Sequence, residues 1–479
     1  MDPLTEFNRN MTRRQLLQQG MAGLGSAALA HLLPGTAFGR GVLDVVHKPA
    51  KAKNVIYLFQ NGGPPHVDMF DYKPRLHDLH RMQVPPSYLA GKRFSTMTKD
   101  AKKALLLAPL EPFHQYGESG AWVSDLLPHT AKIADKLCFV KSMHTEQVNH
   151  APAITFFLTG AETPGRPSMG AWLSYGLGSE NENLPSYVVM TSVSKGTTCG
   201  QIFYDFYWGS GFLPSRHQGV KFRGGGDPVL YLTNPDGISR KMRRGFHDDL
   251  EKLNQVKLDV TGDPEIATRI SQYEMAYRMQ ASVPELTDIS DESEHVLDMY
   301  GPQVKERGTF AHNCLLARRL VERGTRFVQV MHAGWDHHRT LTTELSTQCK
   351  DTDQPAAALV QDLEQRGLLD ETLVIWGGEF GRTPFLQGDI NNRAKWGRDH
   401  HPYAFTLWMA GGGVKPGISY GASDDLGMSV VENPVHVHDF QATVLHQLGI
   451  DHEKLTYKHQ GRHFRLTDVH GHVVNDILA

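Results

Sequence analysis

Cysteine is scarce in this sequence. The 479-residue chain has four cysteines, and no two of them have the spacing of a zinc-binding or redox pair; they are Cys138, Cys199, Cys314 and Cys349. The sequence therefore predicts neither a zinc–cysteine site nor a disulfide framework.

An excess of charge of one sign is also lacking. Charged residues make up 21% of the chain and the formal net charge is −3, so no polyanion such as nucleic acid is expected as an obligate partner. Long apolar runs are missing too. The stretch 21–33 is shorter and richer in glycine than a membrane span, which needs about 20 apolar residues. We therefore expect no stable span after the N-terminal segment is removed.

That N-terminal segment reads as an export signal. The residues Thr12-Arg13-Arg14 precede the short apolar stretch, and small residues follow it near position 39. This pattern is typical of a twin-arginine signal peptide. We predict a signal over residues 1–39, a mature protein that begins near Arg40, and a periplasmic location.

Short buried strands alternate with helical patterns over the rest of the chain. Apolar runs at 53–61, 186–191, 326–331 and 372–376 read as strands, and 150–160, 310–323 and 354–366 read as helices. Such alternation predicts an α/β fold with a mostly parallel central sheet sandwiched by helices. We expect one domain over 40–479, with an insertion around 197–300 and a small C-terminal element from about 451.

Histidines, carboxylates and arginines gather where several of these strands end. The run TLVIWGGEFGRTP (372–384) ends a strand with Glu379 and Arg382, and HAGWDHH (332–338) follows another. The motif GRDHHP (397–402) precedes a further apolar run. Ligands bind at the carboxyl edge of parallel strands, so the sequence predicts a site there, and its histidines and aspartates favour a metal.

In order along the chain, these motifs resemble the alkaline phosphatase superfamily, and its sulfatase branch most closely. The resemblance covers most of residues 53–450. It is closest to an exported, sulfatase-like bacterial family that shares the GGEFGRTP, GWDxH and GRDHHP motifs. In the superfamily's pattern, the nucleophile is a modified Cys, a Ser or a Thr that precedes x-P-x-R. Here His150-Ala151-Pro152 occupies that element, so a formylglycine-type sulfatase is not expected.

The resemblance implies a divalent-metal site. It assigns metal ligands to residues that match the superfamily's motifs, namely Asn61, Asp336, His337 or His338, Glu379, and His400 or His401. One half-site is complete and the other is weakened, because Asn61 is neutral, Glu379 is longer than Asp, and Phe380 replaces a ligand. We therefore expect one ion, or one tightly and one loosely bound ion, and the metal is Zn²⁺ or else Mn²⁺ or Ca²⁺.

Several roles stay open for the residues around the ion. His150 is a candidate nucleophile, a candidate general base toward water on the metal, a further metal ligand, or inert. Arg382 is expected to hold substrate oxygens or to form a structural pair with Glu379 or Asp399. Candidate substrate-binding residues are Asn149, Arg398 and Asp399.

Two functions follow from these residues. The first is a periplasmic metal-dependent hydrolase of a phosphate or sulfate ester, acting on a small molecule or an exported glycan. The second is a catalytically degenerate relative that binds a sulfated or phosphorylated glycan, or a cell-surface partner, without turnover.

Overall fold

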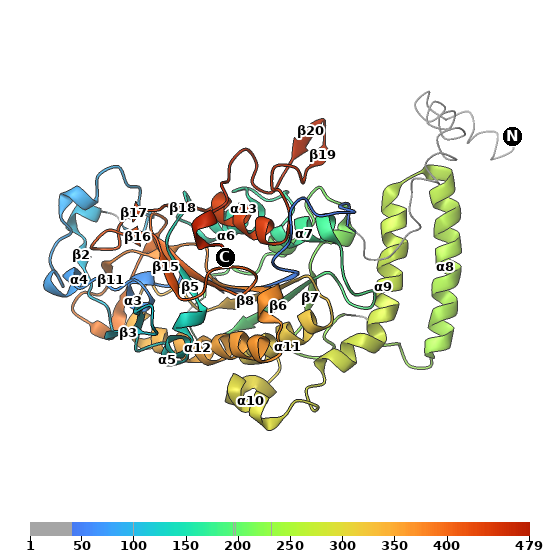
Figure 1. Ribbon diagram of the computed structural model, residues 1–479, viewed down its shortest axis with the longest axis horizontal. Helices are drawn as coiled ribbons and strands as arrows, with labels where there is room; N and C mark the ends of the chain where they lie inside the picture. Colours follow the sequence, from blue (N-terminus) through green and yellow to red (C-terminus); the bar gives the residue numbers. More distant parts are fainter. Residues whose placement is uncertain (1–40, 99, 195, 197, 231) are drawn as a thin grey trace. The chain divides into compact units, whose positions relative to one another are not determined.

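A nine-stranded sheet forms the centre of the computed structural model (Figure 1). Its strands lie in the order β15-β5-β14-β9-β1-β8-β6-β7, and β18 pairs with β5. They are β1 (Asn54–Asn61), β5 (Cys138–His144), β6 (Tyr187–Val193), β7 (Val220–Phe222), β8 (Phe327–Ala333), β9 (Thr372–Gly377), β14 (Phe405–Ala410), β15 (Ile418–Tyr420) and β18 (Val435–His436). The structure describes residues 41–479 except 99, 195, 197 and 231. The predicted signal peptide lies outside these residues.

The expected α/β architecture is confirmed. β1 pairs in parallel with β8 and β9, and β6 pairs in parallel with β8 and β7. β14 runs antiparallel to both of its neighbours, β5 and β9. Because its direction is reversed, the start of β14 lies at the edge where β1, β8 and β9 end.

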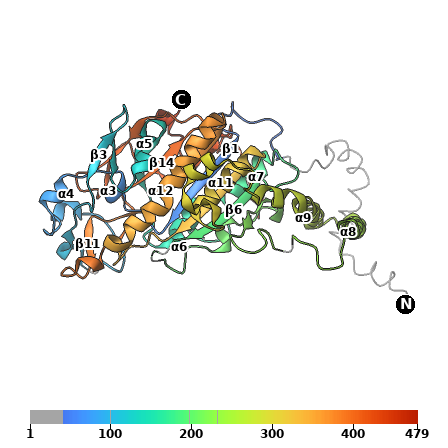
Figure 2. The same ribbon diagram turned by 90° about the horizontal axis from the view of Figure 1, so that it is seen from below.

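Helices cover both faces of the sheet (Figures 1 and 2). β1 shows why, because alternate side chains of a strand point to opposite faces. Ile56 and Leu58 join one apolar core, and Tyr57 and Phe59 join the other. The first core is closed by α5 (Pro128–Lys132), α10 (Glu294–Tyr300), α11 (Phe310–Glu322) and α12 (Leu341–Gln365). The second is closed by α6 (His150–Thr159), α7 (Met169–Leu177) and α13 (Val437–Gln447).

The segment that we expected to be an insertion contributes to the sheet. Its strand β7 forms one edge, beside β6. Two long helices follow, α8 (Arg240–Thr261) and α9 (Pro264–Thr287). Near the C-terminus, Tyr457–His459 and Arg462–Phe464 form a small antiparallel hairpin. None of the helices in the described part of the chain has the length and apolar character of a membrane span.

Candidate metal centre

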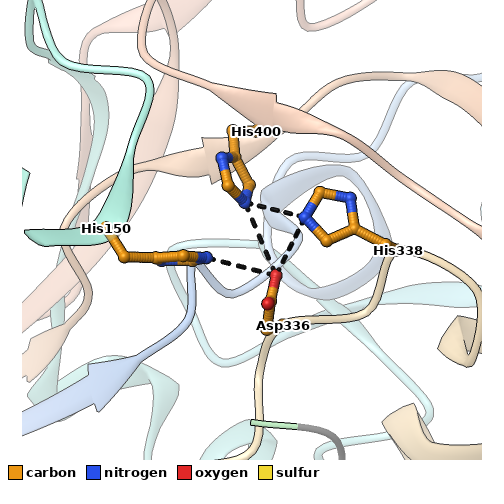
Figure 3. Close-up of side chains that lie close together, drawn as sticks. All are labelled: His150, Asp336, His338 and His400. Atoms are coloured by element: carbon orange, nitrogen blue, oxygen red, sulfur yellow. Dashed lines mark hydrogen bonds and ion pairs between the residues drawn. The ribbon is translucent and has the colours of Figure 1, made fainter. Parts of the chain in front are cut away.

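Three histidines and one aspartate converge at the carboxyl edge of the sheet (Figure 3). His150 is the first residue of α6, and Asp336 and His338 lie in the loop after β8. His400 comes from the short strand His400–His401, just before β14. One potential ligand atom from each residue lies within 4.8 Å of the others. We call these four residues the His/Asp cluster.

The imidazoles surround a single carboxylate oxygen. The Oδ1 atom of Asp336 lies 3.2 Å from Nε2 of His150, 3.0 Å from Nε2 of His338 and 3.5 Å from Nε2 of His400. The Nε2 atoms of His338 and His400 are 2.9 Å apart. The cluster therefore presents three ring nitrogens and a carboxylate to one small volume.

The other ring nitrogen of each histidine faces an oxygen that accepts hydrogen bonds. The acceptors are Oε1 of Glu379 for His150 (2.6 Å), Oε1 of Gln387 for His338 (2.7 Å) and the carbonyl of Val148 for His400 (2.7 Å). In a neutral imidazole, such a bond places the proton on Nδ1 and leaves a lone pair on Nε2.

When the three rings are neutral, three imidazole lone pairs and a carboxylate oxygen thus point into one volume. A divalent cation fits this donor set, because imidazole nitrogens and a carboxylate are its usual ligands. The carboxyl groups and carbonyls that hold the imidazoles from outside are the partners that metal-binding histidines normally have.

The ionisation of the cluster follows from burial and from its own charges. Burial raises the pKa of Asp336, but hydrogen bonds from the three histidines and the charge of Arg382 lower it more, so the net pKa is well below the ordinary range. Burial lowers the pKa of His400 to about 3. Burial also lowers the pKa of His150, but bonds to Asp336 and Glu379 reverse this, and its net pKa is raised.

Glu379 lies behind the cluster rather than in it. Its carboxylate is fully buried and accepts the N–H of Gly62 with both oxygens, at 3.0 and 3.2 Å. Its remaining contact is with Nδ1 of His150. We expected a metal ligand, and the structure shows a carboxylate that orients a histidine of the cluster. Gly62 has φ of +119° and approaches the backbone of Asp336 so closely that a side chain would collide with it.

Of the two roles expected for Arg382, the structure favours the pair with a carboxylate, although the partner is Asp336 rather than Glu379 or Asp399. Its guanidinium is fully buried, with Nη2 2.8 Å from Oδ1 of Asp336. Its N–H groups also donate to four backbone carbonyls, those of Gly62, Gly63, Trp335 and Arg398. With these donors engaged, Arg382 fixes the position and charge of Asp336.

The candidate substrate-binding residues are also mostly engaged elsewhere. Arg398 is buried and forms a two-pronged ion pair with Asp68, at 2.6 and 3.0 Å. Asp399 is buried and accepts the Ser95 hydroxyl at 2.7 Å. These bonds correct the prediction that Arg398 and Asp399 meet the substrate. Asn149 is exposed at the start of α6, where its side chain makes no capping bond.

Each histidine pair has one member in the cluster. His338 and His400 face Asp336, whereas His337 is fully buried outside the cluster. His401 turns to the Met428 carbonyl, 3.1 Å from its Nε2. Asn61 also lies outside the cluster, and its amide donates to the His332 carbonyl at 3.4 Å. His337, His401 and Asn61 are therefore not placed as the ligands that we expected.

Sequence reasoning missed the outer contacts of the cluster. Gln387 lies in the short strand Phe385–Gly388, and Val148 contributes only its carbonyl, so neither belongs to a motif. Phe380, which replaces an expected ligand, is buried with its ring centroid 4.7 Å from that of His400 and 5.1 Å from that of His150. The cluster reaches the surface through Asp336 and His338, whose side chains are 12% and 14% exposed.

The fold and the cluster define an α/β protein with a candidate metal centre at the carboxyl edge of its sheet. The chain belongs to the family described as "Protein of unknown function (DUF1501)", whose model matches residues 52–478. No curated protein matches the sequence.

Several solved structures are similar at low identity. The PsFucS1 sulfatase from Pseudoalteromonas sp. is 13% identical, with a TM-score of 0.34 over 84% of this chain and 68% of that one. A protein in the alkaline phosphatase superfamily from Vibrio parahaemolyticus is 11% identical, with a TM-score of 0.32 over 84% and 69%. The phosphonate monoester hydrolase SpPMH from Silicibacter pomeroyi is 10% identical, with a TM-score of 0.31 over 83% and 73%.

Proposed function

We propose that this protein is an exported, metal-dependent hydrolase of a phosphate or sulfate ester. His150, Asp336, His338 and His400 hold one divalent ion. The ester is carried by a small molecule or by an exported glycan. The proposal is supported by the cluster and by the order of motifs that resembles the sulfatase branch of the alkaline phosphatase superfamily.

The observation that carries the proposal is the outward bonding of all three imidazoles. Each Nδ1 faces an acceptor, so each Nε2 presents a lone pair to the carboxylate of Asp336. Without a bound ion, Arg382 and a second proton on His150 are the positive charges that offset the repulsion between these atoms. A divalent cation among the four ligand atoms would take the place of that proton.

The donor set favours a transition metal over calcium. Calcium takes six to eight oxygen ligands, whereas three imidazole nitrogens and one carboxylate suit Zn²⁺ or Mn²⁺. We therefore propose Zn²⁺ or Mn²⁺ as the resident ion.

The same geometry favours one of the three active roles for His150. Its ring is buried between Glu379 on one side and Asp336 on the other. A nucleophile needs a free lone pair and room for the substrate, and the Nε2 of His150 points at the carboxylate of Asp336. We propose that His150 is a metal ligand and that water attacks the ester.

The bound ion would supply Lewis-acid stabilisation for the charge that develops on the ester oxygens. Among the protein's own groups, Arg382 keeps Asp336 ionised and in place. Asp336 and His338 form the exposed side of the cluster, so they face the entering ester.

Activity assays with matched variants test this function. The purified protein is assayed on aryl phosphates, phosphodiesters, aryl sulfates and sulfated glycans, after its metal content has been measured. We expect Asp336→Ala to lower kcat/KM at least about 100-fold, since it removes the central ligand. Asp370→Ala, at an exposed carboxylate in the turn before β9, is the control and should keep full activity.

If the purified protein contains metal but hydrolyses none of these esters, the proposal that it is a hydrolase is wrong. One feature favours the binding function in that case: Phe380, which replaces an expected ligand, packs against His150 and His400. Calorimetric titration with sulfated and phosphorylated glycans would then show metal-dependent binding without turnover.

A further inference from the structure

Four exposed cationic side chains surround one turn beside the metal centre. The turn, residues 388–395, follows strand β11 (Phe385–Gly388). Each of the four cations belongs to this turn or lies against it; they are Arg81, Arg339, Arg393 and Lys395. We call these four residues the basic patch.

Contacts with the backbone of the turn place the members of the patch. The short helix η8 (Arg393–Lys395) closes the turn and supplies two of the cations. The guanidinium of Arg81 reaches the turn from outside, with Nη2 3.4 Å from the carbonyl oxygen of Ile390. The stem of Arg339 lies beside Gly388, where an added Cβ atom would be 3.7 Å from Cγ of Arg339. The four positive charges therefore gather on one small surface.

The patch has little negative charge of its own. Within the described part of the chain, none of its four members forms an ion pair with a carboxylate. Asp389 is the one acidic residue among residues 388–395, and its Oδ1 accepts the N–H of Asn391 at 3.1 Å. The nearby His80 responds to this field, because burial lowers its pKa and the charges of Arg81 and Arg393 lower it further. The surface is therefore locally positive, although the net charge of the chain is −3.

The basic patch adjoins the exposed side of the His/Asp cluster. Arg339 directly follows His338 in the chain. Gln387, which directly precedes the turn, has its Oε1 2.7 Å from Nδ1 of His338. Neighbouring Cα atoms are about 3.8 Å apart, so a molecule held at His338 lies within reach of long cationic side chains from the turn.

The arginines of the motifs do not offer such charges to a substrate. Arg382 is bonded to Asp336 and to backbone carbonyls, and Arg398 is paired with Asp68. An anionic group that enters beside the ester therefore finds no free guanidinium in these motifs, whereas the basic patch presents four cations at the surface.

We propose that the basic patch binds a second anionic group of the substrate, beside the ester that the metal holds. The inference rests on the proposed hydrolase and narrows its substrate class to an ester on a polyanionic carrier. Guanidinium groups suit this role, because they hold phosphate, sulfate and carboxylate groups with two parallel hydrogen bonds. A surface of one sign also raises the local concentration of a substrate of the opposite sign.

A binding titration tests the patch without requiring turnover. Fluorescence anisotropy measures the affinity of the purified protein for a labelled heparin tetrasaccharide, and competition by inositol hexakisphosphate compares phosphate with sulfate groups. We expect the double variant Arg339→Gln/Arg393→Gln to raise the dissociation constant at least about fivefold at low salt, because it removes two of the four charges. The difference should shrink at high salt, where the charges are screened.

A matched control has the same loss of charge at a distant surface. Lys257→Gln/Arg269→Gln removes two exposed cations from α8 and α9, at the opposite end of the molecule from β11 (Figure 1). This variant should bind the tetrasaccharide as the native protein does. Both double variants change exposed side chains, so both should keep the native melting temperature.

A selectivity measurement connects the patch with the reaction. The probes are a disulfated disaccharide and an aryl monosulfate, or the corresponding phosphates. The ratio of their kcat/KM values should fall at least about fivefold in Arg339→Gln/Arg393→Gln, because only the disaccharide carries the second anionic group. An unchanged ratio, or tetrasaccharide binding that this variant does not weaken, would overturn the proposal. If the variant loses binding but the native protein hydrolyses no ester, the patch is supported and the hydrolase alone is wrong.

Discussion

At the scale of single residues, the hydrogen-bond partners of the three imidazoles explain the geometry of the His/Asp cluster. The three imidazoles are defined by what their outer nitrogens contact. Glu379 is the strongest of these outer partners, because its carboxylate lies 2.6 Å from Nδ1 of His150 and is itself fixed by Gly62. It therefore holds the proton on Nδ1 of His150 and fixes the direction of the ring.

We expect Glu379→Ala to weaken metal binding by about 10- to 100-fold, because His150 loses its orienting partner. A competition titration against a chelator measures the change. Glu371→Ala, which removes an exposed carboxylate paired with Lys53, is the matched control and should leave affinity unchanged. Unchanged affinity in Glu379→Ala would show that His150 does not ligate the ion.

The sequence predicted Asp336 and one histidine of each pair as neighbours, and the structure brings Asp336, His338 and His400 together. The sequence could not show which of His337 and His338 lies beside Asp336. Both follow a strand end, where the loop decides which ring turns inward. The structural burial of Arg382 and Arg398 was also beyond prediction, since an arginine in a motif can equally hold a ligand or the surrounding loops.

At the scale of elements, the reversed direction of β14 brings His400 to the site. The apolar run FTLWMA predicts a buried strand, but such a run carries no information about direction. Because β14 is antiparallel to β9, the residues just before it lie at the carboxyl edge of the parallel strands. A parallel β14 would have placed His400 at the opposite edge.

The predicted helix at 354–366 is also only part of α12, which spans Leu341–Gln365. Its first half reads as polar, but Leu341, Leu345 and Cys349 recur every four residues and are buried. That periodicity was present in the sequence and was hidden by the charged and hydroxyl residues between them.

The positions of His338 and His400 also require close packing of the GRDHHP motif on the loop after β8. Gly397 lies so near the backbone of His338 that a Cβ atom there would collide with it. We expect Gly397→Ala to displace His338 and weaken metal binding, with a loss of about 1–3 kcal/mol of stability. Gly225→Ala, where the space is open, is the control. A Gly397→Ala variant with unchanged metal affinity and melting temperature would contradict this packing.

At the scale of the whole molecule, the α/β class was predictable because the buried strands are continuous apolar runs. The position of α8 was not predictable, since an amphipathic helix does not specify which neighbour its apolar side will meet. Buried histidines outside the metal site, such as His66 and His332, are expected to make the stability of the whole molecule depend on pH.

We expect stability to fall as the pH is lowered from about 6.5 to 4. Burial lowers the pKa of His66 and of His332 to about 4, so the unfolded chain takes up protons that the folded protein does not. Each contributes a loss of about 2 kcal/mol at pH 5 relative to neutral pH. Melting temperatures of the chelator-treated protein across this range measure the effect. His332→Gln should show a shallower slope, and an unchanged slope would contradict the assignment.

The central claim is that His150, Asp336, His338 and His400 hold one metal ion, and metal analysis of adjacent-histidine variants tests it most directly. The protein is purified without added chelator, and Zn and Mn are measured per chain by mass spectrometry. We expect about one ion per chain in the native protein, in His337→Ala and in His401→Ala, and well below one in His338→Ala and His400→Ala. Equal metal content in both members of either pair, or no metal in the native protein after incubation with Zn²⁺ or Mn²⁺, would contradict the claim.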